Sequence, residues 1–100
     1  MNYLAHLLLS ENSPESRLGN LLGDFVKTDA LAPFPLPIQR GVLLHQKIDS
    51  FTDTHAIFQQ SRQRISVERR RFAGILIDIF YDHFLAVHWS TYAGVPLDEF

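Results

Sequence analysis

Hydrophobic positions along the chain recur with helical spacing, and no stretch alternates with a period of two for long enough to predict a sheet. A short first helix is predicted over residues 2–9. Ser13, Pro14 and Glu15 mark the start of a second helix, because they supply an N-cap hydroxyl, a first-turn proline and an acid at the positive end of the helix dipole. We expect that helix to end near Lys27.

Prolines at alternate positions in residues 32–37 forbid a regular helix and predict an extended connector. A third helix is predicted over residues 37–52. After the polar residues 59–64, Ser66 is placed to cap a fourth helix that continues to about Tyr92. The pattern therefore predicts an all-α chain with a single helical domain over residues 1–100.

The composition narrows the class of protein. The 100 residues are 46% hydrophobic and 20% charged, which excludes a disordered chain, and a formal charge of -2 argues against a nucleic-acid binder. The absence of cysteine excludes disulfides, thiolate metal sites and cysteine nucleophiles, and it fits the reducing cytoplasm. Residues 72–89 are apolar but include two aspartates and two histidines, so we expect no membrane span.

The third predicted helix carries polar residues on its apolar side. His45 and Asp49 lie one turn apart in the middle of the apolar arc, Asp53 lies one turn further along, and His55 follows just beyond. One interpretation is a buried hydrogen-bonded pair, with Asp53 capping the next segment. The other is that these side chains belong to a functional site.

The fourth predicted helix is apolar on nearly every face, which predicts burial on all sides. Asp78 and Asp82 lie one turn apart within it, and no Lys or Arg follows Arg71. Two buried like charges need an arginine from another helix, a shared proton or a metal. Carboxylate and imidazole ligands without sulfur suit Mn²⁺, Mg²⁺ or non-haem Fe²⁺. His83 and His6 are each either an additional ligand or a core residue.

Two glycines stand one turn apart in the second predicted helix. Gly19 and Gly23 each cost that helix about 1 kcal/mol relative to alanine, which indicates that another backbone or a ligand approaches there. On the helical wheel Asp24 faces away from the leucine stripe, so the wheel alone predicts a solvated acid.

A basic run separates the polar middle of the chain from the fourth helix. Its five arginines, opposed only by Glu68, are Arg62, Arg64, Arg69, Arg70 and Arg71. The run is either a solvated helix start or a surface for an anionic partner, which would be a phosphate or an acidic protein.

Four strings in the chain together resemble the acyl carrier protein phosphodiesterase family. They are NYLAHL from Asn2, LGNLLGDFVK from Leu18, LHQKIDSFTDTH from Leu44, and residues 70–86 with Asp78 and YDHFLA. The resemblance implies an all-α helical bundle similar to the HD-domain metal-dependent phosphohydrolases. It also implies hydrolysis of the 4′-phosphopantetheine group from holo acyl carrier protein, a reaction connected with fatty acid biosynthesis, with a divalent ion, manganese favoured and Mg²⁺ or Fe²⁺ as alternatives.

The resemblance also covers the acids and histidines of the chain. The matching positions are Asp24, His45, Asp49, Asp53, His55, Asp78 and Asp82, and His6 and His83 lie in matching strings. We expect His45, Asp78 and Asp82 to bind the metal with Asp24 or Asp49, and the remaining acids and imidazoles, Asp53 and His55 among them, to orient ligands or transfer protons. His6 and His83 are additional candidate ligands. Arg69, Arg70 and Arg71 would meet the acidic surface of the carrier protein. Family members are about twice this length, so the chain resembles their N-terminal part and its bundle would be incomplete. Apolar surface left exposed would then favour self-association.

Two other functions stay open on the residues alone. One keeps the metal site but replaces the substrate with a nucleotide or another small phosphate ester. The other is a non-catalytic helical interaction module whose buried acids pair with arginines.

Overall fold

The computed structural model describes all 100 residues, Met1 to Phe100, and contains helices but no strand, which confirms the all-α prediction. The α-helices are α1 (Tyr3–Leu9), α2 (Pro14–Leu22), α3 (Leu36–Asp53), α4 (Ala56–Gln63), α5 (Ala73–Val87) and α6 (Trp89–Tyr92). Three short 3₁₀ helices are η1 (Thr28–Ala30), η2 (Val67–Phe72) and η3 (Leu97–Glu99). None of the helices has both the length and the apolar character needed to cross a membrane.

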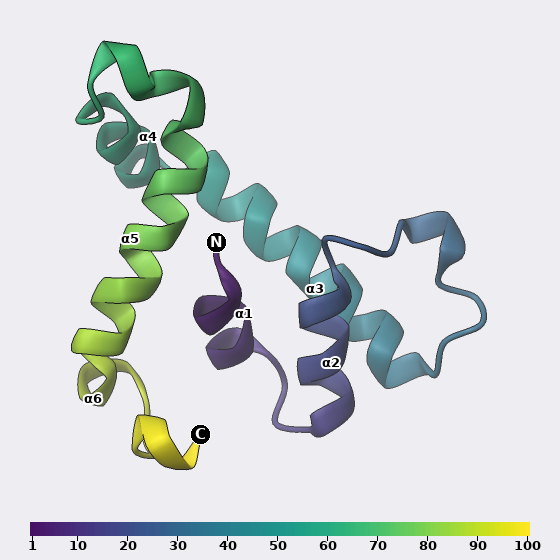
Figure 1. Cartoon of the computed structure of the whole chain (residues 1–100). Helices are drawn as coiled ribbons and strands as arrows, with labels where there is room; N and C mark the ends of the chain where they lie inside the picture. The colour runs from purple at the N-terminus through teal and green to yellow at the C-terminus, as the bar shows by residue number, and fades with distance from the viewer.

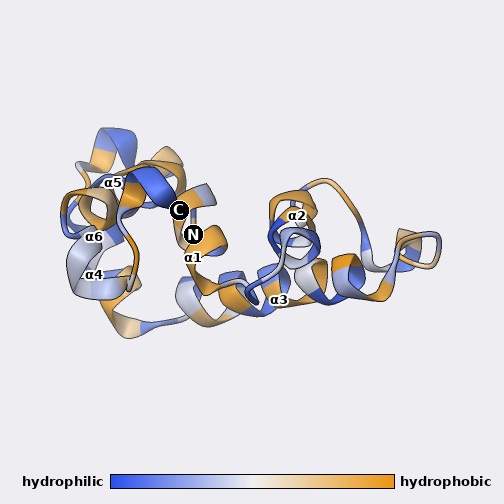
Figure 2. Ribbon diagram, turned by 90° about the horizontal axis from the view of Figure 1, so that it is seen from below, coloured by the Kyte–Doolittle hydropathy of each residue, from blue (hydrophilic) through white to orange (hydrophobic).

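The helices form two groups with α1 between them. In Figure 1 the long helix α3 lies behind α2, while α4, α5 and α6 gather on the other side of α1. Figure 2, turned by 90°, shows the same division, with α2 resting on α3 and the α4–α6 group beyond α1. The two chain ends lie near α1 in this second view. Residues from both groups meet around α1 and where the end of α3 approaches α4 and α5.

Helices α2 and α3 pack backbone against backbone through glycines. The Cα atom of Gly41 lies 2.8 Å from the position that a Cβ on Gly19 would take, and the Ile38 carbonyl oxygen lies closer still. A Cβ on Gly23 would overlap the ring of His45. The close approach predicted from Gly19 and Gly23 is confirmed, and both glycines are needed because any side chain would separate the helices.

Helix α2 begins as the sequence predicts but is shorter. The side chain of Ser13 accepts a hydrogen bond from the Ser16 N–H at 3.1 Å, and Pro14 occupies the first turn. The helix ends at Leu22, however, and not near Lys27, because the chain turns after Gly23. Asp24 therefore lies beyond the helix, but it is 56% exposed, which agrees with the solvated acid that the helical wheel predicted.

The later part of the chain is more broken than its pattern suggests. Residues 56–63 form α4, although their polar character hid this helix, and the segment from Ser66 begins as 3₁₀ helix η2 with no side-chain cap at Ser66. Helix α5 starts only at Ala73, and the chain bends at His88 before α6. The prediction of one continuous helix capped by Ser66 was therefore wrong.

Burial of α5 on all sides was also wrong. Only Ala73 and Ile77 are buried, while five large side chains, Ile75, Ile79, Phe80, Phe84 and Val87, are exposed. The whole chain exposes 7001 Å², against about 5,800 Å² expected for a compact monomer of this mass.

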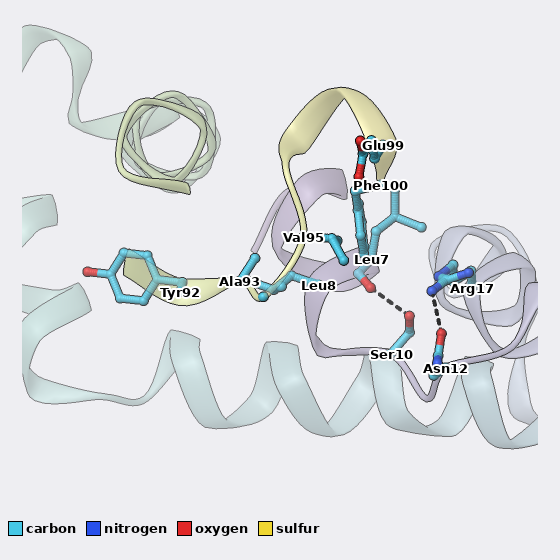
Figure 3. A pocket seen from close by; sticks show the side chains of 11 residues that line it. Leu7, Leu8, Ser10, Asn12, Arg17, Tyr92, Ala93, Val95, Glu99 and Phe100 are labelled. Atoms are coloured by element: carbon cyan, nitrogen blue, oxygen red, sulfur yellow. Dashed lines mark hydrogen bonds between the residues drawn. The ribbon is translucent and has the colours of Figure 1, made fainter. Parts of the chain in front are cut away.

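A cavity of about 470 Å³ lies between α1 and the C-terminal segment (Figure 3). Hydrogen bonds from Ser10 to the Leu7 carbonyl and from Arg17 to Asn12 brace one wall, and the Phe100 ring lies 5.3 Å from the Arg17 guanidinium carbon. None of the acids and histidines singled out above lines it. The chemistry-bearing residues gather elsewhere.

Candidate metal centre

His45 is the most firmly held member of the site. It projects from α3 with 2% of its side chain exposed, and its Nδ1 donates to the backbone carbonyl of Asn20 at 2.6 Å. That bond fixes the tautomer and aims Nε2 at Asp24 and Asp49, whose carboxylate oxygens lie at 3.0 and 3.1 Å. Nε2 thus faces two anions, where it either shares a proton with them or gives its lone pair to a cation.

His6 reaches the same place from α1. Its side chain is 0% exposed, and its ring stacks on that of His45 with centroids 3.7 Å apart and planes 10° from parallel. Nε2 donates to Asp49 Oδ1 at 3.0 Å and to the Met1 carbonyl at 3.1 Å, while Nδ1 is buried without a partner. Burial and the neighbouring His45 lower the pKa of His6, so the neutral imidazole, which is the form that binds metals, is favoured.

Asp49 joins the two imidazoles. One carboxylate oxygen faces His6 and the other faces His45, one helical turn earlier on α3, as the i, i+4 spacing predicts. Ligand atoms of these three residues all lie within 4.8 Å of one another. Two nitrogens and a carboxylate suit a first-row divalent ion, and the partnerless His6 Nδ1 shows that hydrogen bonds within the chain do not satisfy this cluster. The residues present therefore fit a metal.

A cation already lies against these acids. The amino-terminal ammonium of Met1 is 2.9 Å from Asp49 Oδ1 and 3.4 Å from Asp78 Oδ1. Burial lowers the pKa of this ammonium, but the hydrogen bond to Asp49 and the charges of Asp78, Asp49 and Asp53 outweigh it, so the pKa is raised overall. The electrostatic field of the site thus favours positive charge.

Asp78 extends the site across to α5. Its side chain is 29% exposed, and its Oδ1 is buried without a well-directed hydrogen bond. Burial raises the pKa of Asp78, and Asp53 and Asp49 raise it further, against the opposing pull of the Met1 ammonium. Its negative charge is incompletely compensated, as the sequence argument expected, although α5 is half open to solvent.

Asp82 has a different set of partners. Its two carboxylate oxygens accept from the backbone N–H groups of Leu4 and Ala5 at 2.9 and 3.1 Å. These are orphan donors of the first turn of α1, where Asn2 makes no side-chain cap. Asp82 thus caps α1 from α5 and fixes the helix that carries His6. Backbone N–H groups neutralise it, an alternative that the sequence argument did not consider.

The remaining acids and histidines divide into two sets. Asp24, 56% exposed, and Asp53 line a cavity of about 360 Å³ together with Met1, Asp49 and Asp78. His55 lies apart: it accepts from the Ile57 N–H at 3.1 Å as the N-cap of α4. His83 is exposed on α5, with its ring against Phe84.

Asn20 and Met1 belong to the site but were missed by sequence reasoning. Asn20 acts through its backbone carbonyl and Met1 through its backbone ends, so neither side chain carries a signal. The glycine spacing of α2 was the available clue, because the missing side chain at Gly23 lets the His45 ring reach that carbonyl.

The arginine run lies on the surface near this cavity. Arg69, Arg70 and Arg71 follow one another in η2 and are exposed, and none of them forms an ion pair with an acid of the chain.

The family model and the similar proteins found by comparison carry the same family description. All residues from 1 to 100 match the family model described as acyl carrier protein phosphodiesterase. The chain is 40% identical to the acyl carrier protein phosphodiesterase of Klebsiella pneumoniae over 101 residues, covering 100% of this chain and 52% of that protein. Identity to the protein of the same name from Yersinia pestis is 42%, over 90% of this chain and 47% of the relative. Identity to the protein of the same name from Escherichia coli is 41%, over 100% of this chain and 52% of the relative. The chain thus spans about half the length of these relatives, and no solved structure matches it.

Proposed function

Because the chain belongs to the acyl carrier protein phosphodiesterase family, we propose that it carries the metal centre of an enzyme that hydrolyses the 4′-phosphopantetheine group from holo acyl carrier protein. The observation that supports this most is the convergence of two buried imidazoles on the two oxygens of one carboxylate, beside an acid-lined cavity. A metal-dependent phosphodiesterase needs such a cluster to hold a cation at a phosphoryl group.

His6, His45 and Asp49 would hold the ion, with Asp24 and Asp78 next to it. When bound, a divalent ion supplies charge neutralisation at phosphoryl oxygens and a source of nucleophilic water at neutral pH. Manganese is our preferred ion, with Mg²⁺ or Fe²⁺ as alternatives, because the donors are nitrogen and oxygen without sulfur. This set places His6 among the ligands and gives Asp82 the positioning of α1.

The chain's own residues account for the other needs of the reaction. The hydrogen bond from His45 Nδ1 to the Asn20 carbonyl keeps Nε2 aimed at the site. Asp53 and Asp24 lie on the solvent-exposed side of the cavity, where either carboxylate can accept a proton from an attacking water. His55 is outside that cavity, so we propose no proton transfer by it.

We propose acyl carrier protein as the partner, bound at the arginines of η2. Arg69, Arg70 and Arg71 are exposed and free of ion pairs, so they can meet an acidic protein surface. The exposed apolar face of α5 supports self-association as well, which sedimentation velocity at increasing concentration would detect. A fold like that of the HD-domain hydrolases stays a prediction.

The test is an assay of the purified chain with holo acyl carrier protein and Mn²⁺, in which mass spectrometry follows the loss of phosphopantetheine. We expect apo protein to appear, EDTA to stop its formation, and His45→Ala to reduce the rate at least 100-fold. A panel of nucleotides is run in parallel, and cleavage of nucleotides alone would replace the carrier-protein substrate. A thermal melt that neither EDTA nor Mn²⁺ changes, together with no turnover, would favour a non-catalytic interaction module.

A further inference from the structure

A second cavity, of about 330 Å³, adjoins the acid-lined one. The two share Asp53, Asp78 and Ile75 as a common wall. Arg62, from the last turn of α4, and Arg71, from η2, both line the second cavity. Figure 1 shows why residues from these elements meet: α4 lies beside the first turns of α5 at one end of the molecule. The chain thus places two arginine residues in the wall of a cavity that adjoins the proposed metal centre.

Neither guanidinium group has an acidic partner. The ion pairs of the chain include Arg40 with Glu11, but none that involves Arg62 or Arg71. Arg62 is half-buried, and the guanidinium carbon of Arg71 lies 5.5 Å from the ring centroid of Phe72. Gly74 in the same wall has nothing within 4 Å of the place where its Cβ would lie, so this side of the cavity is open. Both arginines are available to an anionic ligand.

The charge of the acid-lined cavity shows why such cations are needed there. Asp24, Asp49, Asp53 and Asp78 face one ammonium, which leaves three negative charges, and a divalent ion would still leave one. A phosphodiester carries a further negative charge and would be repelled. Two arginines beside the centre reverse that balance, and guanidinium groups match phosphoryl oxygens in geometry as well as in charge.

We infer that Arg62 and Arg71 bind the phosphoryl oxygens of the substrate and position the phosphodiester against the metal centre. This inference rests on the proposed function, which supplies the phosphodiester. It separates the arginines by role: Arg71 lines the cavity with Arg62, whereas Arg69 and Arg70, which do not line it, are left for the protein partner. Arg62 and Arg71 are therefore positioning residues for any phosphodiester, with or without a carrier protein attached.

The first experiment measures binding and does not depend on turnover. Inorganic phosphate is titrated into the ¹⁵N-labelled chain in the presence of Mg²⁺, and the arginine Nε–H signals are followed by NMR. We expect saturable shifts for Arg62 and Arg71, much smaller shifts for Arg70, and loss of the Arg62 response in Arg71→Gln. Equal, unsaturated shifts of all arginines would overturn the inference, because they would indicate only general ionic attraction.

The second experiment compares two substrates. With Mn²⁺ and the small phosphodiester bis(4-nitrophenyl) phosphate, we expect Arg62→Gln and Arg71→Gln each to lower kcat/KM at least tenfold, mainly through KM. The matched control is Arg40→Gln, at an exposed arginine that lines neither cavity, and it should stay within twofold of the unaltered chain on this substrate. Melting temperatures confirm that all three variants fold.

The two experiments separate failure of the inference from failure of the proposed function. If the unaltered chain cleaves neither substrate, the proposed function fails for this chain, and the phosphate titration alone decides whether Arg62 and Arg71 form an anion site. If the unaltered chain is active but Arg40→Gln and Arg71→Gln lose equally on both substrates, the inference is wrong and the proposed function stands.

Discussion

The two halves of the molecule are held together by different forces. Helices α2 and α3 meet along glycines so closely that a single added carbon would overlap backbone atoms. Helix α5 buries only Ala73 and Ile77, and polar groups link it to α1: Asp82 to two backbone N–H groups and Asp78 to the Met1 ammonium. Steric fit therefore fixes one half, and a few charged groups attach the other.

The proposed metal centre lies where these two kinds of attachment meet. His45, Asp49 and Asp24 come from the tightly packed half, whereas Asp78 comes from the loosely attached one. His6 belongs to α1, which contacts both halves. The difference teaches that the His45 imidazole, which lies at the glycine contact between α2 and α3, is preorganised. The position of Asp78, which α5 supplies, depends on electrostatic interactions.

The largest effect should come from adding a side chain at the glycine contact between α2 and α3, where Gly19 meets Gly41. In Gly19→Ala the new methyl group meets the Ile38 carbonyl and the Gly41 Cα atom, backbone atoms that cannot move independently of α3. We expect a loss of about 3 kcal/mol in the free energy of unfolding, measured by urea titration. Gly74→Ala is the matched control on α5, and because its Cβ meets nothing it should be neutral or stabilising by up to about 1 kcal/mol. Similar losses in both variants would remove the contrast between the halves.

Next in size is the effect of removing the charge from α5. Asp78→Asn should weaken Mn²⁺ binding about 10-fold to 100-fold in calorimetric titrations, since a carboxylate next to the ion is lost. The same change should leave the metal-free chain no less stable, because burial raises the pKa of Asp78 and its charge is unfavourable there. Asp98→Asn, at an exposed acid of η3, is the control. Unchanged Mn²⁺ affinity in Asp78→Asn would exclude this carboxylate from the metal centre.

A smaller loss is expected when the cap of α1 is removed. Asp82→Ala leaves the N–H groups of Leu4 and Ala5 without acceptors and should cost about 1–2 kcal/mol, measured by thermal and urea unfolding of the metal-free chain. Asp82→Asn keeps one acceptor oxygen and should recover part of that loss. If Asp82→Ala instead lost metal affinity with no change in metal-free stability, the carboxylate would be a ligand and not a cap.

The smallest effect should be a pH dependence from His6. The pKa of His6 is lowered in the folded chain, so the unfolded chain binds the proton first as the pH falls. The contribution of His6 to the free energy of unfolding is therefore fully present above pH 6.5, the pKa of a free histidine, and is lost as the pH drops through the lowered pKa. One such group contributes at most about 1.4 kcal/mol per pH unit. Asp78, whose pKa is raised, acts in the opposite direction at lower pH. Metal-free His6→Gln, melted at pH 7.5 and 5.5, should show a weaker dependence than His88→Gln at an exposed histidine. Equal slopes would contradict the assignment to His6.

Capping residues and helical spacing predicted those features of the fold that depend on residues close together in the sequence. The Ser13 cap, the extent of α3 to within a residue, and the shared direction of His45 and Asp49 all follow from spacing along one helix. The glycine pair of α2 was also informative, because its cost has no local compensation and indicates a close neighbour.

Sequence could not predict contacts whose partners lie far along the chain. Asp82 contacts backbone 77 and 78 residues away, and backbone groups look alike in every sequence. The exposure of Asp24 was predicted, but its contact with His45 was not, because α2 ends at Leu22 and the helical wheel does not extend to Asp24. Residues 56–63 hid a helix because only Phe58 is buried there, so the apolar stripe that identifies a helix is almost absent.

The hydrogen bonds between Asp82 and the first turn of α1 have a consequence for the order in which the helices fold. The segment that carries His6 is synthesised first, yet its anchoring aspartate follows 78 positions after Leu4. In a nascent chain, α2 can pack against α3 early, whereas the capping of α1 by Asp82 must wait until α5 has left the ribosome. Ion uptake would then begin only after α5 has bound α1, when the two imidazoles come face to face.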